Sequence, residues 1–183
     1  MNSINKTLII TDSLGLPRDF PENVNYSKTW PKLLSRSFEI YQISKWGATI
    51  EDLYNQVVYS KSFNPDIVII QAGIVDCAPR ALSKLESDII NKFKIFSFVF
   101  SKLINKKSIY FLRKYRNINY TSISKFEEFI IKLNNEFNNL IWIPIIPACK
   151  DYESLVPNIS ININKYNNLL NQELVTNCWK LMN

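Results

Sequence analysis

A serine follows an apolar run near the start of the chain, in the segment LIITDSLGLP at residues 8–17. A serine at the end of a strand can act as a nucleophile when its hydroxyl is exposed and a neighbouring group takes its proton. Serine is also common in ordinary turns, where its side chain bonds to the nearby backbone. The choice between these two interpretations of Ser13 depends on what the other strand ends carry.

The chain contains only three glycines, Gly15, Gly47 and Gly73, whereas average usage would give about a dozen in a chain of this length. Each follows an apolar, strand-like run within a few residues, where glycine permits a positive φ angle and lets a ligand approach the backbone. Any one of them alone is best interpreted as a turn glycine. The coincidence of all three at strand ends favours a ligand site along one edge of a sheet.

Short runs rich in Ile and Val alternate with segments of helical spacing. The expected strands are residues 7–10, 38–43, 66–72 and 140–146, and the expected helices are 29–38, 49–59, 83–104, 122–137 and 162–174. This alternation predicts an α/β fold with a parallel sheet covered by helices on both faces. Ligands of such sheets bind outside the carboxyl ends of the strands.

The composition predicts one domain over residues 1–183, with 46% hydrophobic residues and a net charge of +6. The first residues resemble a strand more than a signal peptide, so we expect a cytoplasmic protein. Cys77, Cys149 and Cys178 are odd in number and widely spaced, which is typical of reduced thiols. No metal-site spacing is present, and neither a metal nor a cofactor is expected.

Three short blocks occur in order: TDSLG at 11–15, SKWGAT at 44–49 and AGIVD at 72–76. Together they resemble the first three blocks of the SGNH, or GDSL, hydrolases. The resemblance implies a three-layer, flavodoxin-like fold and a serine esterase that cleaves acyl esters, including acetyl groups on polysaccharides. It implies Ser13 as the nucleophile, and the N–H groups of Ser13 and Gly47 as oxyanion donors.

Longer strings narrow this resemblance. One branch of the superfamily, associated with bacterial surface-polysaccharide gene clusters, has similar segments. The segments of this chain that resemble it are GIVDCAPR at 73–80, KTWPKLL at 28–34 and INKYNNLL at 163–170. The expected ligand is therefore an acyl ester of a small molecule or a glycan.

Two features depart from the family pattern. Where the third block has an asparagine that donates to the oxyanion, this chain has Val75, and the whole sequence contains no histidine. The last family block, Asp-x-x-His, is therefore missing, and no Ser-His-Asp triad can form. Because serine is a weak nucleophile without a base, we expect poor hydrolysis.

The C-terminal residues suggest an explanation for the missing block. LVTNCW at 174–179 could form a short fifth strand; otherwise the strand at 140–146 is an exposed apolar edge. We infer a C-terminally incomplete, truncated or frameshifted relative of these esterases, with four or five strands. The alternatives are a complete, non-catalytic protein that binds a carbohydrate or acyl group, and a domain that interacts with a membrane surface.

Four further residues are expected to bind substrate: Asp12, Gly73, Asp76 and Arg80. Asp12 could instead cap the turn before Ser13. Asp76 and Arg80 are four residues apart, so a local ion pair is an alternative to an Arg80 that holds an anionic group.

A basic segment at 93–116 follows a broad apolar stripe. Its composition suits peripheral contact with an anionic membrane, but a core helix followed by a solvated basic loop is the commoner explanation. Nucleic-acid binding is not expected, because no recognised module accompanies the charge. The oligomeric state is not predicted.

Overall fold

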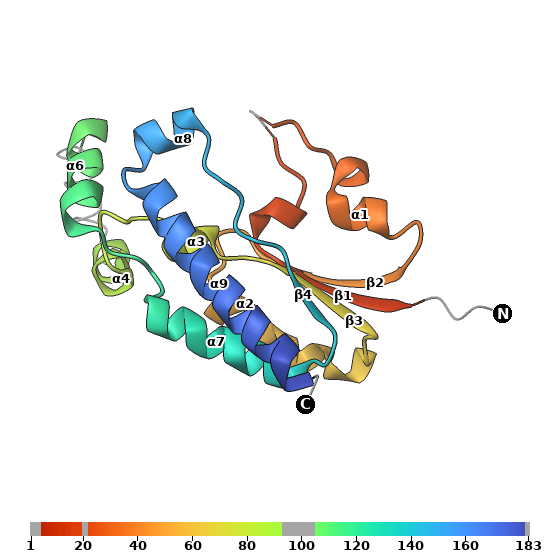
Figure 1. Ribbon diagram of the computed structural model, residues 1–183. Coiled ribbons are helices and arrows are strands. Elements are labelled where there is room, and N and C mark those ends of the chain that lie inside the picture. The colour runs from red at the N-terminus through yellow and green to blue at the C-terminus, as the bar shows by residue number, and fades with distance from the viewer. Residues whose placement is uncertain (1–4, 20–21, 93–104, 182–183) are drawn as a thin grey trace.

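The computed structural model describes residues 5–19, 22–92 and 105–181. In this part of the chain, four strands form one sheet in the order β2-β1-β3-β4, and every neighbouring pair is parallel (Figure 1). The strands are β1 (Lys6–Thr11), β2 (Glu39–Ser44), β3 (Ile67–Gln71) and β4 (Leu140–Trp142). The predicted α/β class with a parallel sheet is confirmed.

Helices connect the strands and cover the sheet. The α-helices are α1 (Trp30–Leu34), α2 (Ile50–Val57), α3 (Ile74–Cys77), α4 (Lys84–Lys92), α6 (Lys106–Arg116), α7 (Ile123–Glu136), α8 (Lys150–Leu155) and α9 (Ile159–Leu181), and the 3-10 helices are η1 (Ser13–Gly15), η2 (Tyr26–Lys28) and η3 (Val58–Phe63). Helices α2, α7 and α9 pack together on one face of the sheet, and α1 lies on the other face (Figure 1).

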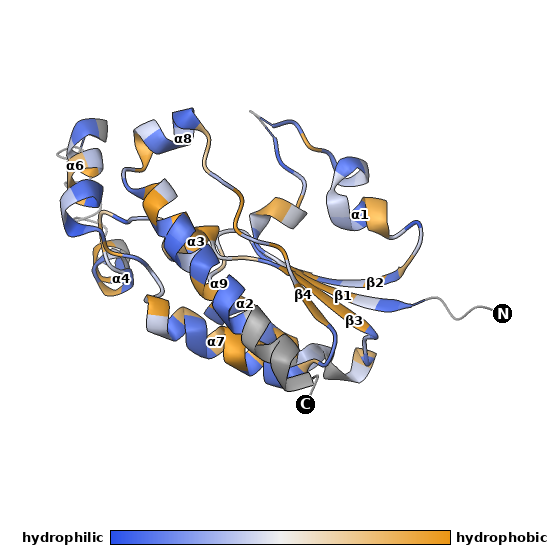
Figure 2. Cartoon of the chain, viewed as in Figure 1, coloured by the Kyte–Doolittle hydropathy of each residue, from blue (hydrophilic) through white to orange (hydrophobic). Residues whose placement is uncertain are grey.

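The strands are apolar on both faces because both are covered. Leu8 and Ile10 of β1 are fully buried in a cluster with Phe126 of α7 and Tyr166 of α9. Ile9, between them, is equally buried on the opposite face. Full burial of each such side chain contributes about 1.5–3 kcal/mol. Figure 2 shows the apolar strands at the centre and polar residues along the outer sides of α7 and α9.

The strand register brings three loops to one edge. Thr11, the last residue of β1, is level with Ser44 of β2 and with Gln71 of β3. The segments that follow these three strands therefore start side by side at the carboxyl edge of the sheet. These are the segments that contain Gly15, Gly47 and Gly73.

Of the four or five strands expected, the described residues form four, and the possible fifth strand at 174–179 is helical. Residues 174–179 belong to the last turns of α9, a helix of 23 residues. No glycine or proline interrupts residues 159–181, so the helix continues. The strand at 140–146 is also shorter than expected, because Pro144 follows and has no N–H for the ladder. β4 forms one edge of the sheet, and Ile141 on it is 52% exposed.

The basic segment is partly helical. Its residues 106–116 form α6, where a solvated loop was expected. The Asn105 side chain caps the helix by accepting from the Ser108 N–H at 2.8 Å, and Asn117 ends it with φ 42°. Residues 93–104, which carry much of the expected membrane contact and the end of the 83–104 helix, lie outside the described residues.

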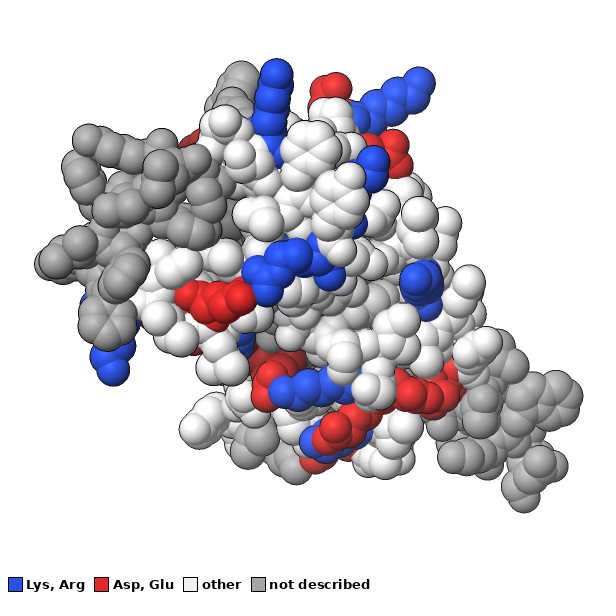
Figure 3. All heavy atoms as spheres, turned by 90° about the vertical axis from the view of Figure 1, so that its left-hand side faces the viewer, with Lys and Arg blue, Asp and Glu red and all other residues white. Residues whose placement is uncertain are grey.

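The side of the molecule at the left of Figure 1 carries charges of both signs. Figure 3 shows Lys and Arg side chains interspersed there with Asp and Glu. Arg116 of α6, for example, pairs with Glu86 of α4 at 2.8 Å. None of the helices in the described ranges has both the length and the apolar character needed to cross a membrane.

Candidate active site

Ser13 begins η1 directly after β1. Asp12 caps this turn: its Oδ1 accepts from the Leu14 N–H at 2.9 Å. Arg18 folds back on the same turn and donates from Nη1 to the carbonyls of Leu14, at 3.0 Å, and Ser13, at 3.3 Å. Gly15 is needed because a Cβ there would lie 2.1 Å from Cγ2 of Thr11. The turn therefore holds Ser13, which is half-buried, in a defined position.

The loop after β2 runs beside this turn. The Lys45 N–H donates to the Thr11 carbonyl at 3.3 Å, which ties the two loops together. Gly47 has φ +62° and is exposed, with open space where a Cβ would be. Its neighbour Trp46 is 60% exposed. Gly47 therefore lets the chain turn, and its predicted role as an oxyanion donor stays a prediction.

The third glycine serves the packing of the loop after β3. Gly73 has φ +122° and is buried, and a Cβ there would lie 2.6 Å from Cδ1 of Ile145 and 3.2 Å from Cζ of Phe126. The side of Gly73 on which a Cβ would lie therefore faces the core, where a side chain would not fit. The next two residues, Ile74 and Val75 at the start of α3, turn toward Ser13 and line the same cleft.

These loops enclose a cleft of about 510 Å³. Residues of the TDSLG, SKWGAT and AGIVD blocks all contribute to this cleft, together with Tyr152 of α8. It is lined by Ser13, Leu14, Pro17, Arg18, Asp19, Glu22, Trp46, Ile74, Val75, Arg80 and Tyr152. The structure thus brings Ser13 and Arg80 together in one cleft, whereas Asp12 and Asp76 are fully buried beneath it.

No base is positioned on Ser13 in the described part of the chain. Its Oγ makes no hydrogen bond to any of those residues; only its carbonyl has partners, Arg18 and the Leu16 N–H. Val75 supplies an apolar side chain to the cleft where an amide would be an oxyanion donor. Among the described residues the cleft therefore offers a serine hydroxyl but no group within hydrogen-bond distance that could take its proton.

Asp76 joins the loops from below the cleft. Both of its carboxylate oxygens accept from the Ile50 N–H at the start of α2, at 3.1 Å each. Its Oδ1 also accepts from the Thr121 hydroxyl. No ion pair forms between Asp76 and Arg80. Asp76 therefore fixes the beginning of α2, which follows the Gly47 loop, against the segment after β3.

A set of polar side chains extends this network into the helices. Tyr166 of α9 donates its hydroxyl to the Thr121 carbonyl and accepts from Asn119 at 3.2 Å. Asn162, one turn earlier, donates to the Cys77 carbonyl at 2.9 Å. Sequence reasoning missed Thr121, Tyr166 and Asn162 as parts of the site. The sequence offered no signal that singles them out, because Asn162 and Tyr166 lie in a segment rich in asparagine, ININKYNNLLNQ at 161–172.

The two buried carboxyls are hard to ionise. Burial raises the pKa of Asp12 to about 6, although the Leu14 N–H and Arg18 oppose the shift. Burial likewise raises the pKa of Asp76 to about 6, against its hydrogen bonds from Thr121 and Ile50, and the Asp12 charge adds to the increase. Asp12 Oδ2 is buried without a hydrogen-bond partner. Two buried carboxyls with raised pKa values therefore lie beyond the ends of β1 and β3, close to the Ser13 turn.

Arg80 forms one wall of the cleft. Its backbone pairs with Ile118, through the Arg80 N–H and the Ile118 carbonyl at 2.8 Å. The guanidinium lies 4.5 Å from the centre of the Tyr120 ring and donates to the Val75 carbonyl at 3.3 Å. Sequence reasoning identified Arg80 but missed Tyr120, which supports it.

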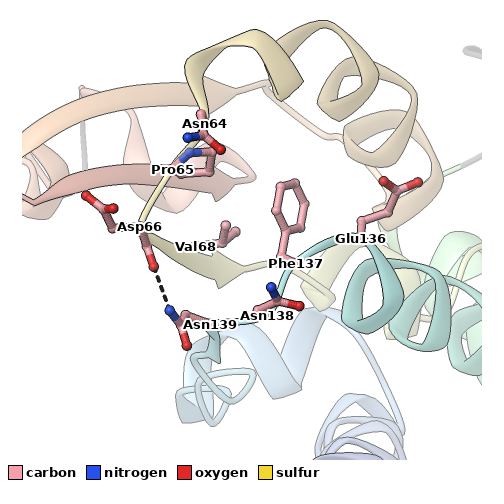
Figure 4. A pocket seen from close by; sticks show the side chains of 8 residues that line it. All are labelled: Asn64, Pro65, Asp66, Val68, Glu136, Phe137, Asn138 and Asn139. Carbon is pink, nitrogen blue, oxygen red and sulfur yellow. Dashed lines mark hydrogen bonds between the residues drawn. The ribbon is translucent and has the colours of Figure 1, made fainter.

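A second cavity, of about 470 Å³, lies at the opposite edge of the sheet (Figure 4). Its lining residues come from the start of β3 and from the segments before β3 and β4, and they include Asp66, Glu136 and Asn139. Asn139 donates to the Asp66 carbonyl at 3.0 Å, and the Asp66 carboxylate accepts from the Lys6 N–H at 2.8 Å. These polar groups hold the strand starts together, far from the loops that carry Ser13.

No protein-family model matches the sequence, and no curated protein matches it. Solved structures do match. A lipase/acylhydrolase from Enterococcus faecalis has a TM-score of 0.61 at 13% identity, covering 95% of this chain and 73% of that one. A lipolytic protein of the G-D-S-L family from Desulfitobacterium hafniense has a TM-score of 0.51 at 15% identity, covering 92% and 70%.

A third similar structure is the acetyl xylan esterase AlAXEase. Its TM-score is 0.50 at 20% identity, with 94% of this chain and 73% of that chain covered. The chain therefore has the three-layer α/β fold of SGNH-type esterases, in agreement with the resemblance of its sequence blocks. At these identities the likeness establishes the fold, and the chemistry has to be argued from the cleft.

Proposed function

We propose that the Ser13 cleft binds the acyl ester, specifically the acetyl ester, of a bacterial surface carbohydrate. The observation that carries the proposal is the position of Ser13, at the carboxyl end of β1 and open to a cleft built by the first three loops. The fold is one that serves ester hydrolysis in the similar solved structures. Trp46, exposed at the cleft, offers a flat apolar surface for a sugar ring.

In this proposal Ser13 Oγ faces the carbonyl carbon of the acyl group. Attack would form an acyl-serine ester and release the carbohydrate hydroxyl, and water would then release the acid. The backbone N–H groups of Ser13 and Gly47 would donate to the carbonyl oxygen as it becomes negative.

The proton of Ser13 Oγ needs an acceptor, and the 183 residues contain no histidine. In a serine protease, loss of the triad histidine lowers kcat by about 10⁶-fold. We therefore propose that the protein binds the ester far better than it turns it over. Binding of an acylated carbohydrate without cleavage is the limiting case.

The test is hydrolysis of p-nitrophenyl acetate by the purified protein, with and without imidazole as a soluble base. We expect little turnover alone, and an imidazole-dependent increase that is absent in Ser13→Ala. Imidazole also hydrolyses this ester by itself, so the Ser13→Ala protein supplies the matched background. Equal rates for both proteins at every imidazole concentration would remove Ser13 from the chemistry.

A further inference from the structure

Arg80 lacks a protein counterion among the described residues. No Asp or Glu there forms an ion pair with it, and its one side-chain hydrogen bond goes to the Val75 carbonyl at 3.3 Å. Its Nε is buried and has no partner. A partly buried guanidinium that is neither paired with a carboxylate nor fully hydrogen-bonded is unfavourable unless another anion offsets it.

The guanidinium is also held in a fixed orientation. The Arg80 backbone pairs with Ile118, and Tyr120 supports the side chain, with the ring centre 4.5 Å away. Arg80 lines the cleft, whereas Tyr120 is not among the lining residues. A guanidinium whose plane is fixed loses little entropy when it forms two parallel hydrogen bonds to a carboxylate.

The other charged residues that line the cleft come from one short segment of the chain. Arg18, Asp19 and Glu22 belong to the segment after Ser13, and Arg18 pairs with Glu22 at 3.8 Å. The cleft residues from α3 and α8, Ile74, Val75 and Tyr152, are uncharged. Arg80 is therefore the one charged residue among the lining residues outside the segment after Ser13.

We propose that Arg80 is an anion-binding residue of this cleft and that the carbohydrate it takes is an acidic sugar, held through its carboxylate. Trp46 at the cleft would pack on the sugar ring, and Arg80 would bind the carboxylate with two hydrogen bonds. That the same sugar bears the ester rests on the proposed function; the carboxylate subsite rests on Arg80 and Tyr120 alone.

The test is an NMR titration with two probes of the same shape, D-glucuronate and its neutral amide, D-glucuronamide. We expect glucuronate to bind about tenfold or more tightly than the amide, since hydrogen bonds to a charged group are about twice as strong as neutral ones. Arg80→Gln should abolish this difference, because the variant has no cation to distinguish the carboxylate from the amide. Arg36→Gln, which removes an exposed arginine outside the cleft, should preserve it.

Equal binding of the two probes to the unaltered protein would overturn the proposal, as would a preference for glucuronate that survives Arg80→Gln. If Arg80→Gln fails to fold, Arg80→Lys serves, and we expect it to lose most of the preference because an ammonium cannot form the paired contact. Failure of the proposed function would give a different result from failure of the Arg80 proposal. In that case glucuronate would still bind through Arg80, but acetylation of a glycan would make no difference to its binding.

Discussion

The Asp76 carboxylate accepts the Ile50 N–H with both of its oxygens, at 3.1 Å each. This contact joins the segment after β3 to the first residue of α2, 26 positions earlier in the chain. Ile50 follows the loop of Trp46 and Gly47, and Asp76 follows Val75. The contact therefore sets the distance between two walls of the Ser13 cleft.

Replacing Asp76 should destabilise the fold. Asp76→Ala leaves the Ile50 N–H and the Thr121 hydroxyl buried without their acceptor, and we expect a loss of about 2–4 kcal/mol in the free energy of unfolding. Urea denaturation measures this loss in the free energy of unfolding. Asp88→Ala, at an exposed position of α4, should change stability by less than about 0.5 kcal/mol; similar losses in both variants would argue against the buried contact.

The buried carboxyls predict that stability decreases with pH. Asp12 and Asp76 have pKa values of about 6 in the folded chain, against 3.8 for an ordinary aspartate. Between these values the folded chain binds more protons than the unfolded chain, so the free energy of unfolding falls as pH rises from about 4 to about 6 and beyond.

Asp12→Asn tests this origin, because the amide oxygen can still accept from the Leu14 N–H. We expect the variant to be more stable than the parent at pH 7.5, by about 1–3 kcal/mol, and to show a smaller loss between pH 4.5 and 7.5. Thermal unfolding across this pH range measures the effect. An unchanged pH profile would show that Asp12 ionises normally in the folded protein.

Two glycines should respond differently to the same substitution. Gly73→Ala forces a φ of +122° on alanine and places its Cβ 2.6 Å from Ile145, so we expect a loss of about 2–4 kcal/mol. Gly47→Ala meets nothing within 4 Å at φ +62° and should lose only about 1 kcal/mol. Chemical denaturation compares them, and equal losses would contradict the packing role of Gly73.

An amide at position 75 should improve any Ser13-dependent chemistry. Val75 lines the cleft, and a side-chain oxyanion donor contributes about 10²–10³ in kcat where it is well placed. We expect Val75→Asn to raise the imidazole-dependent rate by about tenfold or more. Ile74→Asn, its neighbour in the same cleft, is the control and should not raise it.

The sequence predicted the sheet well because each strand is an isolated apolar run. β1, β2 and β3 lie within the expected ranges to within a residue or two, and their ends place Ser13, Trp46 and Val75 together. The sequence left residues 174–179 open, because LVTNCW is a short apolar segment whose length and composition suit a strand and a helix equally. No glycine or proline lies between Ile159 and Leu181, so the helix continues through this segment.

The rest of the site could not be predicted, because it comes from segments with no strand-end signal. Thr121 and Tyr120 lie before α7, and Tyr166 lies inside α9. The contacts of Thr121 with Asp76 and Tyr166, and of Tyr120 with Arg80, depend on how α7 and α9 pack against the sheet. The segment INKYNNLL contains Tyr166, but nothing in its sequence connects this residue with the loop after β3.

The most direct test of the central claim is binding of an acetylated oligosaccharide compared with the same oligosaccharide after chemical deacetylation. Isothermal titration calorimetry gives the two dissociation constants, and NMR shift changes locate the ligand. We predict at least about tenfold tighter binding of the acetylated form, with the largest shifts at Ser13, Trp46 and Val75. Equal affinity for both forms, or shifts confined to residues outside the Ser13 cleft, would contradict the account.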